Sequence, residues 1–190
     1  MQTTKSKNVY KLTLCAVFVA LASVLSLIKI YKLPLGGSVT LFSMLPIIML
    51  ALLLGARWGF ASSFVYSLIQ LGFGITLDGL FGWGLTSLSL IGTIVLDYII
   101  PFSLLGLVGF LKNQKPINIV LATIAVMVIR FLCHFLSGII IFDIWCEWES
   151  VWFYSLCYNG SFMLPELVFT AVSAGVIFSL PVIKRIKDKI

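Results

Sequence analysis

Residues 117–141 read INIVLATIAVMVIRFLCHFLSGIII, an almost unbroken apolar run that decides the class of this protein. About 20 mainly apolar residues are needed for a helix to cross the hydrocarbon core of a bilayer. The whole chain shares this character, since 61% of its 190 residues are hydrophobic, 11% are charged and the mean hydropathy is +1.13. A soluble domain needs more polar surface than that. Because the runs are too long for the alternating strands of a membrane β-barrel, we predict an all-α membrane protein.

Working outward from this run, we predict a single membrane domain over residues 1–190. It is a bundle of six transmembrane helices at about 11–31, 40–55, 57–76, 88–111, 117–141 and 152–182. The first run has the position of a signal peptide, but it is long enough to span and further membrane segments follow, so we interpret it as a retained helix. The second is short for a straight crossing, which predicts either a tilted helix or one completed by surrounding protein.

The basic residues are distributed unevenly between the two sides of this bundle. Ten of the 13 fall on one side: Lys5, Lys7, Lys11, Arg57, Lys112, Lys115, Lys184, Arg185, Lys187 and Lys189. The other side holds Lys29, Lys32, Asp78, Asp143, Glu147 and Glu149. The bias predicts that both termini are cytoplasmic. The net charge of +6 therefore reflects topology and contact with anionic lipid headgroups of the bilayer, and we expect no nucleic-acid partner.

Four ionisable residues remain inside the predicted spans, where each costs several kcal/mol unless it is paired or wetted. They are Asp97, Arg130, His134 and Glu166. Counting from the predicted helix ends, Arg130 and Glu166 lie near the middle of the membrane. Their opposite charges at similar depth predict an ion pair between two helices, with a structural role favoured over contact with a substrate.

A second, shallower layer lies toward the outer surface. It contains Asp97, Tyr98, His134, Tyr154, Tyr158 and Asn159, with Trp145, Trp148 and Trp152 close by. A carboxylate among aromatic rings and amide or hydroxyl groups suits a cationic guest that carries rings. Pro101 cannot donate to the carbonyl of Asp97, so we expect a loosened helix there. The plainer alternatives are an interfacial belt of aromatic residues and a histidine bonded to a neighbouring helix.

The sequence contains no pattern typical of a metal site or of an enzyme. The four cysteines (Cys15, Cys133, Cys146 and Cys157) show no CxxC spacing, and Cys133 beside His134 is more typical of apolar packing than of a metal ligand. We therefore predict no metal site, no catalytic residue and no cofactor. The chain also lacks the GxxxxGK[ST] phosphate loop, so it cannot hydrolyse ATP alone.

Several segments together resemble a known family, and the resemblance covers nearly the whole chain. They are KLPLGGSVTLFSMLPIIMLALLLGARWGF at 32–60, SLIQLGFGI at 67–75, LDY at 96–98, HFLSG at 134–138 and YSLCYNGSFMLPE at 154–166. The family is the thiamine-specific substrate-binding component of energy-coupling-factor transporters. The resemblance implies a six-helix protein of the prokaryotic plasma membrane that binds thiamine from outside. It also implies delivery of the vitamin with a separate membrane scaffold subunit and two ATPase subunits.

The resemblance also assigns roles to residues of this chain. Its binding positions fall on Asp97 (facing the cationic guest), Tyr98, His134, Tyr154 and Asn159. The acidic residue of the family can be Glu, and Asp97 is one methylene shorter. A ligand-stacking tryptophan is implied between the last two spans, where Trp145, Trp148 and Trp152 compete and we favour Trp148.

Two further features follow from the resemblance. A tryptophan implied in the first outer loop is absent, with only Tyr31 nearby, and Gly36, Gly37 and Ser38 would form the flexible part of this lid. Ala16 and Ala20, four residues apart, resemble the motif by which such components dock on the scaffold. Small residues at this spacing let another helix approach closely, although internal packing explains them equally well.

Three other functions stay open at this point. The chain could be a sister component for another vitamin, such as riboflavin or a thiamine precursor, in which case a neutral guest would leave Asp97 without a partner. It could be an intramembrane enzyme that uses Asp97 and His134 as acid and base, although no second nucleophile or metal triad converges with them. It could also be a structural membrane protein, which would show no saturable ligand binding.

Overall fold

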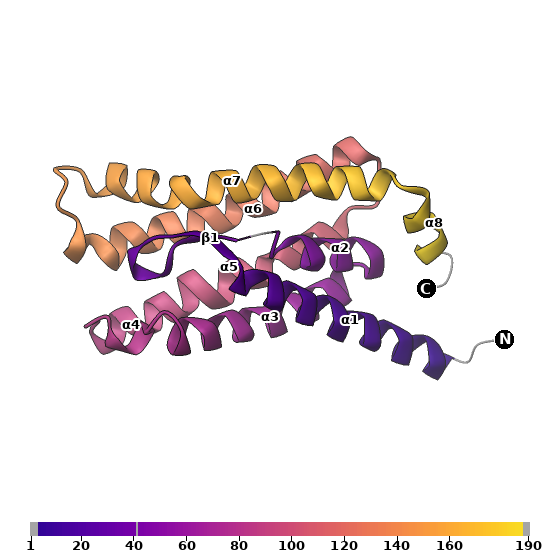
Figure 1. Ribbon diagram of the computed structural model, residues 1–190, viewed down its shortest axis with the longest axis horizontal. Coiled ribbons are helices and arrows are strands. Elements are labelled where there is room, and N and C mark those ends of the chain that lie inside the picture. Colours follow the sequence, from indigo (N-terminus) through magenta and orange to yellow (C-terminus); the bar gives the residue numbers. More distant parts are fainter. Residues whose placement is uncertain (1–3, 41, 188–190) are drawn as a thin grey trace.

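The computed structural model describes residues 4–40 and 42–187, so Lys189 of the predicted cytoplasmic cluster lies outside the described residues. Five helical segments are long and apolar enough to cross a membrane, and both described ends of the chain lie at the same end of the bundle (Figure 1). The principal elements are α1 (Thr4–Leu27), β1 (Lys29–Lys32), β2 (Ser38–Thr40), α2 (Leu45–Leu54), α3 (Ala56–Thr76), α4 (Ser87–Thr93), η3 (Ile94–Ile99), α5 (Ile100–Ser103), η4 (Leu104–Phe110), α6 (Pro116–Ile140), α7 (Val151–Ser179) and α8 (Pro181–Lys187). Short 3-10 turns occupy η1 (Pro34–Gly36), η2 (Leu80–Gly82) and η5 (Phe142–Trp145).

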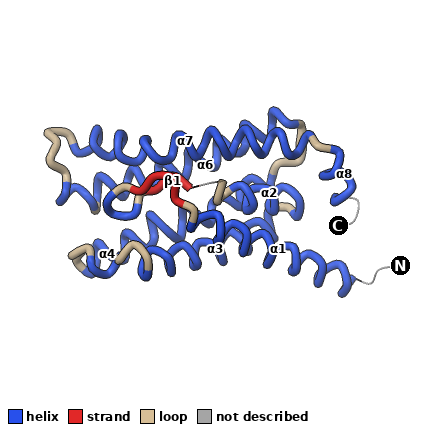
Figure 2. The backbone as a smooth tube through the Cα atoms, viewed as in Figure 1, coloured by secondary structure: helices blue, strands red, loops and turns tan. Residues whose placement is uncertain are grey.

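The all-α class is confirmed, but the structure adds a two-stranded antiparallel hairpin that the sequence reading did not predict (Figure 2). Strands β1 and β2 pair Lys29 with Thr40 and Lys32 with Ser38. The prediction that the first helix continues to residue 31 is therefore wrong, because the chain leaves the helix after Leu27 and turns into β1. The sixth helix also ends early, at Ser179, and Pro181 begins the separate helix α8.

The second predicted span is the least regular part of the bundle. Helix α2 has 10 residues, which at 1.5 Å per residue is roughly half of the ~30 Å hydrocarbon core. Strand β2 and a turn precede it, and the polar side chains of Thr40 and Ser43 there are buried. Non-helical backbone is tolerated at this depth only when protein covers it. The residues before α2 are thus covered by protein, as an irregular segment at membrane depth requires.

The fourth span changes its helical geometry along its length. Helix α4 is followed by the π-helical segment η3, in which Asp97 and Tyr98 lie, and then by α5 and the 3-10 segment η4. The N–H of Ile100 donates to the carbonyl of Val95, five residues earlier, and Pro101 follows directly. This agrees with the expectation that Pro101 loosens the helix near Asp97. Single π turns inside helices frequently mark functional positions.

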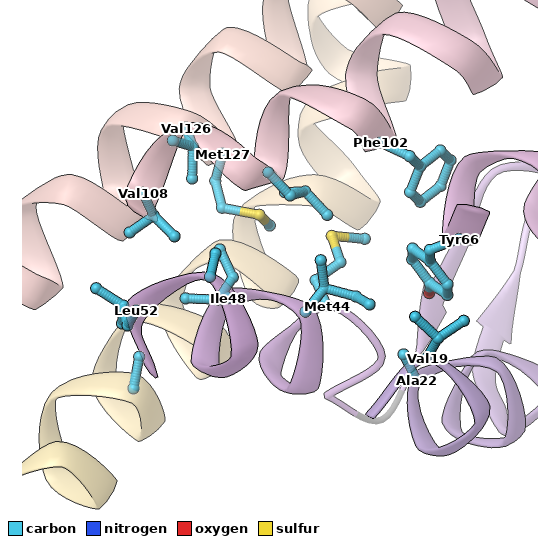
Figure 3. Packing of buried hydrophobic residues seen from close by; sticks show 14 of the residues in the cluster. Val19, Ala22, Met44, Ile48, Leu52, Tyr66, Phe102, Val108, Val126 and Met127 are labelled. Carbon is cyan, nitrogen blue, oxygen red and sulfur yellow. The ribbon is translucent and has the colours of Figure 1, made fainter. Parts of the chain in front are cut away.

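The apolar core lies around α2, between α1, α3, the fourth span, α6 and α7. Figure 3 shows Met44, in the turn before α2, and Ile48 of α2 pointing toward Met127. Tyr66 and Phe102 lie beside them. The Tyr66 and Phe102 rings meet edge to face, with their centroids 5.5 Å apart. Met44 and Phe102 also line the cavity described below. The packed core is therefore the floor of the candidate site.

Candidate ligand-binding site

A cavity of about 130 Å³ lies between the hairpin, α3, the fourth span, α6 and α7. It extends from the loops opposite the chain termini toward the middle of the bundle. Six of the seven predicted binding residues contribute to its wall: Asp97, Tyr98, His134, Tyr154, Tyr158 and Asn159. The fold thus brings together side chains from three helical segments that are far apart in the sequence.

Asp97 lies in this wall with its carboxylate held in a fixed orientation. One oxygen is 2.8 Å from Nδ1 of His134, and the other accepts a hydrogen bond from Ser137 Oγ. The side chain is 14% exposed and opens on the cavity rather than being joined to Arg130. A proton on Nδ1 leaves Nε2 of neutral His134 as an acceptor, and Nε2 is buried with no partner of its own. An empty acceptor beside an oriented carboxylate suits a guest that carries both a positive charge and an N–H group.

The deeper layer is arranged differently. Nη1 of Arg130 lies 3.5 Å from Oε2 of Glu166, and both side chains are almost fully buried. Thr40 and Ser43 donate to the other oxygen of Glu166. The guanidinium also lies over the ring of Phe102, 4.6 Å from its centroid. Every charge here has a protein partner, so the layer ties α6, α7 and the end of the hairpin together.

Asn159 and Tyr158 connect the cavity wall to the neighbouring elements. The side-chain amide of Asn159 donates to the carbonyls of His134 and Ser155, at 3.3 and 3.0 Å, and so joins α7 to α6. Its donors are therefore used within the protein, and its carbonyl oxygen remains for a guest. The hydroxyl of Tyr158 donates to the carbonyl of Pro34 and accepts from the N–H of Gly37, which fastens the hairpin over the cavity.

The tryptophan favoured from the sequence does not lie in the cavity wall. Trp148 is 48% exposed and packs edge to face on Tyr154, with ring centroids 5.6 Å apart. Tyr154 itself lines the cavity, so Trp148 is one ring further out. The tryptophan that does line the cavity is Trp83, in the loop between α3 and α4. Tyr31, the aromatic residue noted near the missing tryptophan of the first outer loop, is 56% exposed on β1.

A comparison of the sequence with known families now bears on these observations. Residues 12–186 match the family described as Thiamine transporter protein (Thia_YuaJ). The chain belongs to this family. It is 26% identical to the Thiamine transporter ThiT of Bacillus subtilis (strain 168), over 92% of this chain and 93% of that protein. It is 29% identical to the Thiamine transporter ThiT of Lacticaseibacillus paracasei, over 73% and 72% of the two chains.

The fold agrees with that membership in the thiamine transporter family. A solved structure of ThiT from Listeria monocytogenes superposes with a TM-score of 0.72 at 18% identity, over 95% of this chain and 98% of that one. With its membrane-spanning helices, the chain is a multi-pass membrane protein. Within residues 4–40 and 42–187, the structure has no group of three His, Cys, Asp or Glu side chains able to hold a metal ion.

Trp83 and Gln70 are among the residues of the cavity wall that the sequence analysis did not predict. Besides Trp83, Gln70 of α3 lines the cavity, and its side-chain Nε2 is buried without a partner. The polar layers predicted from the sequence were built around the four ionisable residues, and the span expected at 57–76, which contains Gln70, holds none of these four. A glutamine inside an apolar run is itself the signal that could have found it, because an amide in hydrocarbon also needs a partner.

The hairpin covers the cavity and contacts the bundle through ion pairs and close packing. Nζ of Lys29 and Nζ of Lys32 both lie 2.8 Å from Oδ1 of Asp78, at the end of α3. Gly37, predicted to be part of the flexible stretch, packs so closely that a Cβ there would lie 2.8 Å from the Tyr158 hydroxyl. The cover is thus joined to the bundle at both edges.

The predicted docking pair Ala16 and Ala20 lies elsewhere, and both residues are exposed on α1. Ala16 lines a shallow groove between α1 and α3, distinct from the cavity. Its other wall includes Trp58, Ala61 and Val65 of α3. The face is therefore open to lipid or to another helix.

Proposed function

We propose that this chain is the substrate-capture subunit of an energy-coupling-factor importer in the prokaryotic plasma membrane. It binds thiamine at the outer side and passes it inward with a separate membrane scaffold and two ATPase subunits. Membership in the thiamine transporter family supports thiamine as the guest. The sequence holds no phosphate loop of its own, which supports a division of labour with separate ATPases.

The observation that carries the proposal is the oriented carboxylate of Asp97 at a cavity with aromatic walls. Thiamine carries a permanent positive charge on its thiazolium ring. A carboxylate facing a low-dielectric cavity is costly without a counter-charge, and the cationic guest supplies it. Tyr98, Tyr154 and Tyr158 provide further aromatic faces, which attract a cation through their ring quadrupoles.

The aminopyrimidine of thiamine matches the remaining polar groups of the wall. Its amino group can donate to Nε2 of His134, which has no partner in the protein. The side-chain oxygen of Asn159 is a second acceptor, because the Asn159 amide donors are bonded to α6 and α7. In this proposal Asp97 neutralises the charge, and His134 and Asn159 fix the orientation of the ring.

The exposed pair Ala16 and Ala20 is the proposed docking point for the scaffold subunit. Their small side chains let a partner helix approach the backbone of α1 closely. The adjacent groove against α3 widens this contact on the same face. Arg130 and Glu166 also line the cavity, and Nε of Arg130 has no partner in the protein. No contact with thiamine is proposed for them, because their charges are paired with each other between α6 and α7.

The decisive experiment is a thiamine titration of the purified protein and of two charge-neutral variants. Asp97→Asn removes the counter-charge and should weaken thiamine binding by roughly 10- to 100-fold, the range for losing a charged contact. Asp143→Asn makes the same change at an exposed position of η5 outside the cavity wall and should leave affinity unchanged.

The same titration separates the sister-component alternative. An analogue of thiamine with a neutral ring in place of the thiazolium should bind the unmodified protein weakly and should be insensitive to Asp97→Asn. Equal affinity of the unmodified protein and Asp97→Asn for thiamine would show that the cation assignment is wrong. Preferential binding of a neutral vitamin would show that this vitamin, and not thiamine, is the substrate. The transport role would then be tested by measuring thiamine uptake into vesicles and whether this uptake requires the scaffold and ATP.

A further inference from the structure

Trp83 lies in the short loop between α3 and α4, and no predicted site includes it. The chain has five tryptophans, all within the described residues, and Trp83 is the one among them that lines the cavity. Trp148 and Trp152 are 48% and 58% exposed at the outer end of α7. The aromatic ring best suited to contact a guest is therefore supplied by a different loop from the one expected.

The indole of Trp83 is held in position from two sides. Its Nε1–H donates to the backbone carbonyl of Asp78 at 2.9 Å. Its ring meets Phe142 edge to face, with centroids 6.0 Å apart. The carboxylate of Asp78 is in turn bound by Lys29 and Lys32 of β1. A ring fixed in this way loses little further freedom when a ligand packs on it.

The tip of the hairpin closes directly against this indole. Gly36 has a φ of +91°, and a Cβ at Gly36 would lie 3.2 Å from Cη2 of Trp83. Leu35 beside it is also left-handed, with a φ of +59°, and both residues line the cavity. The backbone of the tip is therefore bent so that it approaches the far edge of the indole. Trp83 forms the wall of the cavity at the point where hairpin and loop meet.

We propose that Trp83 is the aromatic surface on which the ring system of the ligand packs, and that this indole reports ligand binding. The inference rests on the proposed function, because it takes thiamine as the guest. Both rings of thiamine are flat, and one is cationic. Tryptophan is the side chain whose face attracts a cation most strongly. Trp148 is less suited to this role, because it packs on Tyr154, and Tyr154 is the residue that lines the cavity.

The experiment compares matched tryptophan variants by intrinsic fluorescence and by calorimetric titration with thiamine. In the unmodified protein, thiamine should quench part of the emission. Trp83→Phe should lose most of this quenching and keep an aromatic face, so that affinity falls only slightly. Trp83→Leu removes the face and should weaken binding by roughly tenfold, as expected for a lost cation–π contact. Trp148→Phe is the control and should leave both quenching and affinity unchanged.

The outcomes distinguish a failure of the Trp83 inference from a failure of the proposed thiamine-binding function. Full quenching in Trp83→Phe together with its loss in Trp148→Phe would overturn the inference and would leave thiamine binding intact. No thiamine binding by the unmodified protein, measured by calorimetry, would overturn the proposed function and this inference with it. If Trp83→Leu fails to fold, the quenching amplitude of Trp83→Phe still decides, because phenylalanine keeps an aromatic ring at this position.

Discussion

Two carboxylates, of Glu166 and Asp97, lie within the membrane-spanning part of the chain, and their surroundings differ. Glu166 is 1% exposed, and its two oxygens are shared by Arg130, Thr40 and Ser43. Asp97 is 14% exposed, is bonded by neutral donors at its two oxygens, and faces an open cavity. The first is a closed network whose charge is balanced within the protein. The second has no Lys or Arg partner and lines the cavity, and it is the carboxylate that we propose to face the cationic guest.

The largest effect should come from breaking the closed network. Arg130→Met leaves Glu166 without its counter-charge and should destabilise the fold by about 3–5 kcal/mol, the range for removing one member of a buried ion pair. Thermal unfolding in detergent measures this as a lowered midpoint. The double variant Arg130→Met/Glu166→Leu should recover much of the loss, because it leaves no isolated charge. If Arg130→Met were as stable as the unmodified protein, the ion pair with Glu166 would not be needed for the fold.

A smaller loss of stability should follow from crowding the wall around Asp97. A Cβ at Gly138 would lie 2.2 Å from Oγ of Ser155 on α7. Gly138→Ala should therefore force α6 and α7 apart at an estimated cost of about 1–3 kcal/mol, typical of overpacking. Gly72→Ala is the matched control, since a Cβ there meets nothing within 4 Å and alanine favours the helix. Equal unfolding midpoints for the two variants would argue against close packing at this wall.

Removing a donor from Asp97 should reduce affinity without a comparable loss of stability. Ser137→Ala deletes one of the hydrogen bonds that orient the carboxylate. The expected weakening of thiamine binding is roughly tenfold, as for one hydrogen bond to a charged group. Calorimetry and thermal unfolding on the same sample separate the two effects. A drop in the unfolding midpoint as large as that of Arg130→Met would mean that the shallow layer is structural as well.

The smallest effect should come from the salt bridges that hold the hairpin. Lys29→Met and Lys32→Met together release β1 from Asp78. The Lys29 and Lys32 side chains are 21% and 50% exposed, and ion pairs at the protein surface contribute about 0.2–1 kcal/mol each. Faster release of thiamine in stopped-flow fluorescence is expected, with little change in the unfolding midpoint. Raising the salt concentration should speed release from the unmodified protein and have less effect on the double variant. Lys112→Met, exposed at the other end of the bundle, should behave like the unmodified protein.

The regular helices could be predicted closely from the sequence. The spans expected at 57–76 and 117–141 correspond to Ala56–Thr76 and Pro116–Ile140. Both helices begin next to a strong local signal, Gly55 before the first and Pro116 at the start of the second. The hairpin was not predicted, because its strands are short and are held by partners that are distant in the sequence. Tyr158 and Glu166, more than 120 residues along the chain, bond to Pro34 and Thr40.

The candidate site divides in the same way. Asp97 and His134 stood out because ionisable groups are rare in apolar spans, and the cavity contains both. Trp83 did not stand out because a tryptophan near a membrane surface is usually an interfacial anchor. Only the folded chain brings the loop after α3 against the hairpin tip. The family resemblance implied a ligand-stacking tryptophan in the loop between α6 and α7 instead. Trp148 of that loop packs on Tyr154 and does not line the cavity.

Helix α2 offers too little apolar length to partition into the bilayer unaided, because its 10 residues cover only part of the hydrocarbon thickness. Gly55 alone separates it from the full-length helix α3, and its φ of +83° allows an immediate reversal of direction. During biogenesis, α2 is therefore expected to enter the membrane paired with α3 as one antiparallel unit. A side chain at Gly55 would touch no neighbouring atom in the finished protein. It would still hinder this co-insertion by disfavouring the turn on which the pair depends.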